Sequence, residues 1–351
     1  MSPSIRRLGA ARKGSCLSTL RVLHITNAFP YAEVPEYGVF VKEQIDSLDR
    51  AGVETKVLFM NGRRDGKSAY TKGVSDIRKA AANYDILHCH HLYSGFATAL
   101  AFTGKPVVLS FLNDWLHEMD GVRSELARKL GCGFGVRWAD KVIFKSPVPS
   151  VLGSSDRFVN LPNGVNADQF HIVPREEARA RLGLDPAAFY VLFVSSKDKN
   201  RAQKRYDRFA ATMDIVRQAN PGRKVEELVL VNQPRERVLD FFNSADLHLM
   251  SSDFEGSPNS VKEALCCGVP VVTTEVGNVV EMLQDVPNAH VSPSFEPKAL
   301  AELVQKVIMA DIDRQAIRDG FLAKGLSQEA IAQKLISLYQ ETILRKRKNG
   351  K

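Results

Sequence analysis

The chain has 351 residues, of which 44% are hydrophobic and 25% charged, the usual balance of a folded soluble protein. Its length predicts two domains, and no apolar run reaches the roughly 18 residues that a membrane-spanning helix needs. The five cysteines are scattered without a Cys-x-x-Cys pair, which excludes a disulfide framework and an ordinary zinc site and indicates reduced thiols in the cytoplasm.

The net charge of +8 is carried partly by the two ends of the chain. Residues 1–19 contain Arg and Lys but no continuous apolar core, so we expect a disordered basic leader rather than a signal peptide. We interpret the run Arg345-Lys346-Arg347-Lys348 as a solvated, frayed end. The alternative is peripheral attraction to the anionic inner face of a membrane, at about 1 kcal/mol for each cation. No basic-aromatic pattern indicates a nucleic-acid partner.

Short apolar runs alternate with helical patterns through the first half of the chain. This alternation predicts a parallel sheet with helices on its faces. The predicted strands are Arg21–Thr26, Val53–Met60, Ile86–His90, Val107–Phe111, Val142–Phe144 and Phe158–Leu161.

The pattern restarts near residue 190, after a turn-rich stretch, and predicts a second sheet. Its predicted strands are Tyr190–Ser196, Glu227–Val231, Leu247–Met250 and Pro270–Thr273. We therefore predict an α/β protein of two facing Rossmann-like domains with parallel sheets, residues 20–170 and 171–327, and an interdomain cleft. A final helix and basic tail, residues 328–351, are expected to pack back on the first domain. Ligands of such sheets bind at the carboxyl ends of the strands.

The stretch from Ser251 to Glu281 follows one of these predicted strands. Ser257 is a good N-cap residue, Pro258 fits the first helical position, and Gly268 can end the helix. A helix N-terminus is thus expected at a strand end, where its free N–H groups suit an anion such as phosphate.

Two glutamates lie in this stretch, Glu255 before the helix and Glu263 within it. Glu263 is six residues beyond Ser257, which corresponds to about 9 Å along a helix. Two carboxylates at that separation could accept hydrogen bonds from hydroxyls at opposite ends of a nucleotide-sugar. A bare pair at this spacing is more often two surface charges of a helix, but the flanking cap, glycine and strand favour a site.

Five cations fall within nine residues after the first strand of the second sheet. They are Lys197, Lys199, Arg201, Lys204 and Arg205. A phosphate-binding loop is favoured over a solvated basic loop, because the cluster follows a strand.

Histidines gather at another predicted strand end. We interpret His88 as a core residue and expect His90 and His91 to reach the edge of the cleft, one of them touching sugar or acceptor. Their spacing lacks a third ligand, so no metal is expected.

The segment EGSPNSVKEALCCGVPVV, with Glu255 and Glu263 as E-x7-E, resembles the donor-binding motif of GT-B glycosyltransferases, in particular the retaining family four. The resemblance covers about residues 20–345. It includes the stretches Arg21–Leu48, Asp85–Gly95, Ala139–Ser146 and Leu161–Phe170, and their order is highly specific.

The resemblance implies a role for each matching residue. Glu263 would bind the ribose of the donor and Glu255 its sugar, while Arg201 and Lys204 would hold the diphosphate. The stretch of Gly256, Ser257, Pro258 and Asn259 would present backbone amides to the sugar and phosphates. Gly38 would let the first loop approach the donor phosphate, or simply open the helix that follows.

One departure from the family lies on the acceptor side. Many relatives have a His-Gly-x-Asp stretch where this chain reads SFLNDW, so Asn113 and Asp114, with His91, are the acceptor-side candidates. Retaining members are thought to let the leaving phosphate take the acceptor proton, which implies no metal cofactor.

The resulting hypothesis is transfer of a sugar from a UDP- or GDP-sugar to a glycan or lipid-linked acceptor, with retention, in cell-surface polysaccharide or glycolipid synthesis. The alternatives are a non-catalytic nucleotide- or glycan-binding module on the same fold, which the altered SFLNDW stretch favours, and a sugar-nucleotide epimerase.

Overall fold

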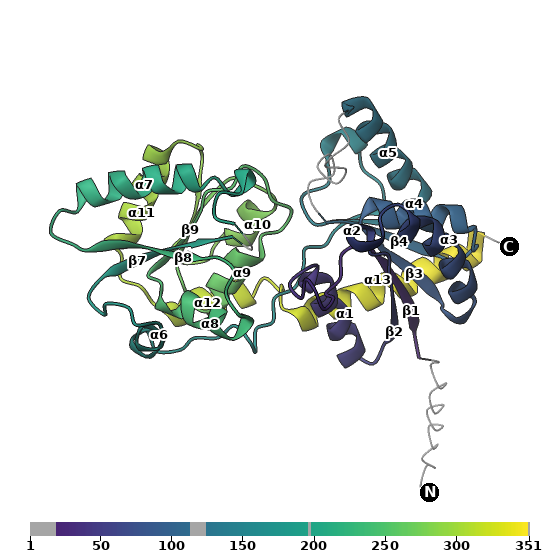
Figure 1. Cartoon of the computed structure of the whole chain (residues 1–351), viewed down its shortest axis with the longest axis horizontal. Helices are drawn as coiled ribbons and strands as arrows, with labels where there is room; N and C mark the ends of the chain where they lie inside the picture. The colour runs from purple at the N-terminus through teal and green to yellow at the C-terminus, as the bar shows by residue number, and fades with distance from the viewer. Residues whose placement is uncertain (1–18, 113–123, 196–197, 350–351) are drawn as a thin grey trace, which may run out of the picture.

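The computed structural model describes residues 19–112, 124–195 and 198–349. It contains two α/β units, and the C-terminal helix α13 (Gln328–Asn349) runs along the first of them (Figure 1). The predicted pair of Rossmann-like units with parallel sheets is confirmed. The predicted leader, the last two residues and the candidates Asn113 and Asp114 lie outside the described residues.

The first unit has a six-stranded sheet in the order β2-β1-β3-β4-β5-β6, and every pairing is parallel. Its strands are β1 (Arg21–Thr26), β2 (Glu54–Phe59), β3 (Ile86–His90), β4 (Val107–Phe111), β5 (Lys141–Phe144) and β6 (Phe158–Asn160). Its helices are α1 (Val39–Arg50), α2 (Gly62–Asp65), α3 (Ser68–Ala80), α4 (Leu92–Ala101) and α5 (Glu125–Trp138). Strands β3, β4 and β5 are buried along their whole length, as expected when helices cover both faces of a parallel sheet.

The second unit has a five-stranded parallel sheet in the order β11-β10-β9-β7-β8. Its strands are β7 (Phe189–Val194), β8 (Val225–Leu230), β9 (Leu247–Met250), β10 (Val271–Thr274) and β11 (Ala289–Ser292). Its helices are α6 (Arg175–Leu182), α7 (Tyr206–Ala219), α8 (Arg235–Ser244), α9 (Asn259–Cys266), α10 (Val279–Leu283), α11 (Pro297–Ile308) and α12 (Arg314–Leu322). In each sheet the order in which strands are added changes side at the first strand. This switch lies between β1 and β3 in the first sheet and between β7 and β9 in the second. Such switch points are where open α/β sheets bind ligands.

Helix α13 ties the end of the chain to the first unit. It packs against α1 and β4, and the buried Tyr339 hydroxyl lies 2.6 Å from Nδ1 of His88. The basic run near the end is helical rather than frayed, contrary to our expectation. Arg345 pairs with Asp156 at 2.5 Å and Lys346 with Asp140 at 2.9 Å, and these ion pairs hold the last turns. No helix among the described residues is long and apolar enough to cross a bilayer.

Candidate functional site

The loops after β7 and β9 meet at the switch point of the second sheet. The backbone N–H of Asp253 donates to the carbonyl of Gln203 at 2.9 Å, and the Gln203 side chain donates to the carbonyl of Phe254 at 2.7 Å. The Ser251 hydroxyl donates to the carbonyl of Lys204 at 3.0 Å. These bonds fix the basic loop against the E-x7-E segment, so the two predicted halves of the donor site lie together.

An ion pair joins the two loops. Nζ of Lys204 lies 2.7 Å from Oε1 of Glu255, and the two side chains are only 15% and 14% exposed. The Ser252 hydroxyl donates to the same carboxylate oxygen at 2.9 Å. A cation predicted to hold phosphate and a carboxylate predicted to contact sugar are therefore in direct contact.

The remaining cations of the basic loop divide into two groups. Arg205 pairs with Asp253 at 3.1 Å and with Asp207 at 2.8 Å. Its guanidinium group therefore stabilises the loop before the E-x7-E segment. Arg201 is exposed, and its side chain makes no hydrogen bond or ion pair with the described residues. Lys199 is exposed, with its amine 4.7 Å from the centre of the Tyr206 ring. Lys197 lies outside the described residues. Among the described cations of the loop, Lys204 is held at the site by its pair with Glu255, and Arg201 has a side chain that is free to reach a ligand.

Helix α9 begins one residue later than predicted, at Asn259, and Ser257 does not cap it. The Ser257 hydroxyl accepts a hydrogen bond from Nζ of Lys262 at 3.0 Å instead, which draws it away from the first turn. Pro258 precedes the helix. The first N–H groups of α9 still follow directly on the loop that carries Glu255 and Gly256.

Gly277, which the sequence analysis did not single out, sets the position of this loop. A Cβ atom at Gly277 would lie 2.4 Å from the carbonyl oxygen of Gly256 and 2.9 Å from that of Glu255, and the residue has a φ of +58°. Only glycine allows this approach in that conformation.

Two buried lysines, one of them beside Glu263 in the chain, were also missed. Lys262, on α9, donates to the carbonyl of Asn163 at 2.9 Å, and Lys145, after β5, donates to Oε1 of Gln44 at 3.3 Å. Burial lowers the pKa of each amine to about 7, and for Lys262 the charge of Lys145 contributes to the lowering. The sequence signal was a lysine inside each of two apolar stretches, VIFKS and SVKEAL.

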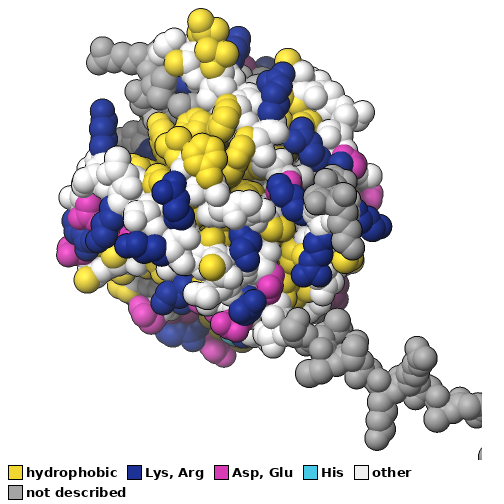
Figure 2. Space-filling view, turned by 90° about the vertical axis from the view of Figure 1, so that its right-hand side faces the viewer, with side chains coloured by type: hydrophobic (Ala, Val, Ile, Leu, Met, Phe, Trp, Pro, Cys, Tyr) yellow, Lys and Arg dark blue, Asp and Glu magenta, His cyan; other side chains and the backbone are white. Residues whose placement is uncertain are grey.

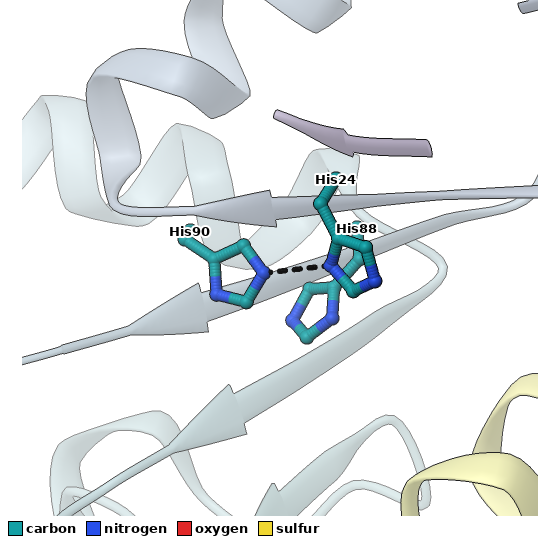
Figure 3. A group of neighbouring side chains, drawn as sticks. All are labelled: His24, His88 and His90. Carbon is teal, nitrogen blue, oxygen red and sulfur yellow. Dashed lines mark hydrogen bonds between the residues drawn. The ribbon is translucent and has the colours of Figure 1, made fainter. Parts of the chain in front are cut away.

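The histidines of the first sheet form a buried cluster with a member we did not expect (Figure 3). Parallel pairing sets His24 of β1 beside His88 of β3, and ring nitrogens of His24, His88 and His90 lie within 4.8 Å of one another. The expectation that a third ligand is lacking is therefore wrong. So is the expectation that His90 reaches the cleft edge, because its ring is 1% exposed and bonds His24 at 2.9 Å.

The cluster is already satisfied largely by protein partners. His88 contacts the Tyr339 hydroxyl at 2.6 Å and that of Ser110 at 2.8 Å, so both of its nitrogens are occupied. Burial lowers the pKa of His24 to about 3 and holds the pKa values of His88 and His90 well below the usual 6.5. Three neutral rings packed in this way are a structural network, and the location of His90 lends no support to a catalytic role.

This network predicts acid sensitivity. An unfolded chain protonates these histidines as pH falls through about 6.5 while the folded chain does not, so the free energy of unfolding should fall as pH drops from 7 to 5, by about 2 kcal/mol in total for each histidine that stays neutral in the folded chain. We expect the thermal unfolding midpoint to decrease by several degrees over that range. His24→Gln should flatten the dependence and His171→Gln, at an exposed position, should not. A parent midpoint that stays constant between pH 7 and 5 would contradict this reading.

His91 and Gly38 both stand at helix starts in the first unit. His91 has a φ of +83°, precedes α4, and its Nδ1 accepts from the N–H of Tyr93 at 3.3 Å. Gly38 has a φ of +71° before α1, and a Cβ atom there would lie 2.4 Å from the Ala28 backbone. Local packing alone therefore requires a glycine at position 38, and the donor and acceptor roles of both residues stay predictions.

Two side-chain oxygens near the E-x7-E loop are buried without a hydrogen-bond partner in the described part of the chain. They are Oδ1 of Asn259, on the first turn of α9, and Oδ1 of Asn278, next to Gly277. A buried acceptor without a donor is costly unless a ligand or water satisfies it. A separate hollow of about 750 Å³ lies between β6, α10 and α13. Asn278 lines it, but none of the predicted donor residues does.

The sequence of the chain is similar to those of known glycosyltransferases. The family model for glycosyl transferases group 1 matches residues 214–320. The chain is 24% identical over 314 residues to D-inositol 3-phosphate glycosyltransferase 1 of Catenulispora acidiphila, covering 76% of this chain and 74% of the relative. It is 22% identical to the putative teichuronic acid biosynthesis glycosyltransferase TuaC of Bacillus subtilis, covering 86% and 92%.

Solved structures share the fold. Sucrose-phosphate synthase from Thermosynechococcus elongatus superposes with a TM-score of 0.73 at 16% identity, covering 93% of this chain and all of that one. Anabaena HepE in complex with UDP superposes with a TM-score of 0.67 at 16% identity, covering 92% and all of that chain. The protein is a glycosyltransferase with the GT-B fold. More particularly, its second unit carries a glycosyl transferases group 1 domain, which includes Glu255, Glu263 and the loop between them.

Proposed function

We propose that the protein transfers a sugar from a UDP- or GDP-sugar to a glycan or lipid-linked acceptor, with retention at the anomeric carbon. The observation that carries this proposal is the Lys204–Glu255 ion pair of 2.7 Å at the switch point of the second sheet, beside the N-terminus of α9. It joins the cation that we expect to bind phosphate to the carboxylate that we expect to bind the sugar.

The chemistry of the leaving group explains why both charges are needed there. The nucleoside diphosphate gains negative charge as the glycosidic bond breaks, and preorganised cations stabilise that charge best where water is excluded. Lys204 and the N–H groups of α9 are fixed beforehand, and Arg201 is free to close on the phosphates. Glu255 would then accept hydrogen bonds from sugar hydroxyls, and the unpartnered Oδ1 of Asn259 would accept another.

Glu263 would hold the ribose at the other end of the donor. It lies on α9 and is half-buried, close enough to Lys262 to affect the pKa of that amine. A ribose diol can donate two hydrogen bonds to one carboxylate, which makes a charge-assisted contact.

The named relatives and neighbours support the choice of donor and acceptor class. HepE was solved with UDP and with UDP-glucose. The two relatives are named as a D-inositol 3-phosphate glycosyltransferase and a putative teichuronic acid biosynthesis glycosyltransferase. We carry over a nucleotide-sugar donor and a hydroxyl-bearing acceptor, and we place the reaction in cell-surface polysaccharide or glycolipid synthesis on the cytoplasmic side.

We also propose that transfer needs no metal. Lys204, Arg201 and the α9 N-terminus can balance the diphosphate charge, and the histidine cluster is buried within the first sheet. Activity should survive an excess of EDTA. Loss of activity with chelator and its rescue by Mg²⁺ or Mn²⁺ would contradict the proposal.

A thermal-shift screen against UDP-, GDP- and ADP-sugars tests donor binding. A donor at 100 times its dissociation constant should add about 2.7 kcal/mol to the free energy of unfolding. Glu263→Ala, with donor affinity about tenfold weaker, should reduce this gain to about 1.4 kcal/mol at the same donor concentration, and Glu281→Ala, outside the loop, should leave it unchanged. Stabilisation by none of these compounds would oppose the proposal.

A further inference from the structure

Helix α5 packs on the first unit through one side only. Its buried residues are Cys132, Gly135 and Val136, and a Cβ atom at Gly135 would lie 2.5 Å from Cδ1 of Leu92. The opposite side of the helix therefore faces solvent in the described structure, where polar residues are the rule.

That outward side is apolar instead. Leu126, Leu130 and Phe134 recur every four residues, which places them in one stripe, and their exposed fractions are 67%, 66% and 45%. The face of the molecule that includes α5 displays a gathering of hydrophobic side chains with Lys and Arg around it (Figure 2). Contiguous exposed apolar surface of this kind marks an interaction site.

The charges next to the stripe are mainly positive. Glu125 is the only acidic residue of α5, and Lys129 pairs with it at 2.7 Å. A hollow of about 220 Å³ lies at the C-terminal end of the helix, and its basic lining residues are Arg137, Arg157, Arg345 and Lys346. Asp140 and Asp156 pair with Lys346 and Arg345, which leaves the four cations an excess of two charges.

We propose that α5 is a membrane-docking helix for an anionic bilayer. Leu126, Leu130 and Phe134 insert among the lipids, and the cations of the hollow contact headgroup phosphates. An apolar stripe flanked by Lys and Arg is the pattern of a helix that lies in the plane of the membrane interface. The stripe stands on the outside of a helix and not in a groove, so a bilayer suits it better than a peptide, and the excess of cations selects anionic lipid. From the sequence we expected this attraction in the tail alone, whereas in the structure Arg345 and Lys346 line the same hollow as Arg137 of α5.

Co-sedimentation of the full chain with vesicles tests the proposal. The protein should bind vesicles of phosphatidylcholine with phosphatidylglycerol, bind those of phosphatidylcholine alone much more weakly, and lose affinity as salt is raised. The double variant Leu126→Gln/Leu130→Gln keeps the net charge and should bind at least roughly tenfold more weakly. Lys129→Ala and Arg137→Ala should each weaken binding by roughly fivefold.

Met309→Gln is the matched control, because Met309 is 80% exposed but lies after α11 in the second unit. It should bind vesicles like the parent, and all variants should keep the parent unfolding midpoint because the changed residues are exposed. Failure of the parent to bind anionic vesicles would overturn the proposal, and so would equal binding by the double variant. A dimer in light scattering that the double variant dissociates, without vesicle binding, would assign the face to a second copy of the chain. Donor binding is measured separately, so the outcome of the vesicle experiment does not decide the proposed glycosyltransferase function, and the reverse also holds.

Discussion

Lys204→Ala is expected to lower turnover by about 10²- to 10³-fold while raising the Michaelis constant for donor much less. The charge on the leaving phosphate grows in the transition state, so a cation held at that point contributes most there. Lys204 is fixed by its 2.7 Å contact with Glu255 and does not need to reorganise. Steady-state kinetics over a range of donor concentrations would separate the two constants.

Arg201→Ala should act in the same direction as Lys204→Ala, since Arg201 is the other available cation of the loop. Lys199→Ala is the control: its amine lies over the Tyr206 ring, and turnover should stay within a few-fold of the parent. If Lys204→Ala and Arg201→Ala also leave turnover within a few-fold, this loop is not the phosphate site, and the binding-module alternative gains ground.

Glu263→Ala and Glu255→Ala should separate binding of the nucleotide from binding of the sugar. Glu263→Ala is expected to weaken the free nucleoside diphosphate and the whole donor by a similar factor, on the order of tenfold for one lost charge-assisted contact of about 1.5 kcal/mol or more. Glu255→Ala should spare the free nucleotide and reduce transfer. Calorimetric titration of nucleoside diphosphate and intact donor into each variant measures both.

The ion pair complicates the Glu255 variant, because removal of the carboxylate also frees Lys204. Glu255→Ala could therefore bind free nucleoside diphosphate slightly better than the parent, since Lys204 no longer has a competing partner. Equal losses of free-nucleotide affinity in both variants would contradict the division of roles.

The strands that the sequence predicted best are those buried on both faces. Ile86–His90, Val107–Phe111 and Leu247–Met250 were predicted with their observed bounds, because a parallel strand covered by helices on both sides is a continuous apolar run. β11 (Ala289–Ser292) was missed. It is a short edge strand with three half-exposed residues, so its composition carries no apolar signal.

The sequence predicted which residues follow a strand, but it did not predict which of these residues are in contact. The sequence indicates that Lys204 and Glu255 each follow a strand, but their contact depends on β7 and β9 being neighbours in the sheet. The same limit explains the missed His24, which joins His88 only through the register of β1 on β3. Gly277 was missed because its close approach to Gly256 is a tertiary contact between loops.

The most direct test of donor cleavage is to measure nucleoside diphosphate and sugar released by the purified protein from UDP-, GDP- and ADP-sugars. We predict that one donor yields nucleoside diphosphate, slowly with water and faster with a suitable acceptor, and that Lys204→Ala reduces this yield by about 10²-fold or more. A donor that binds but is never cleaved would contradict enzymatic transfer, and a donor recovered intact with an altered sugar would assign the site to epimerisation.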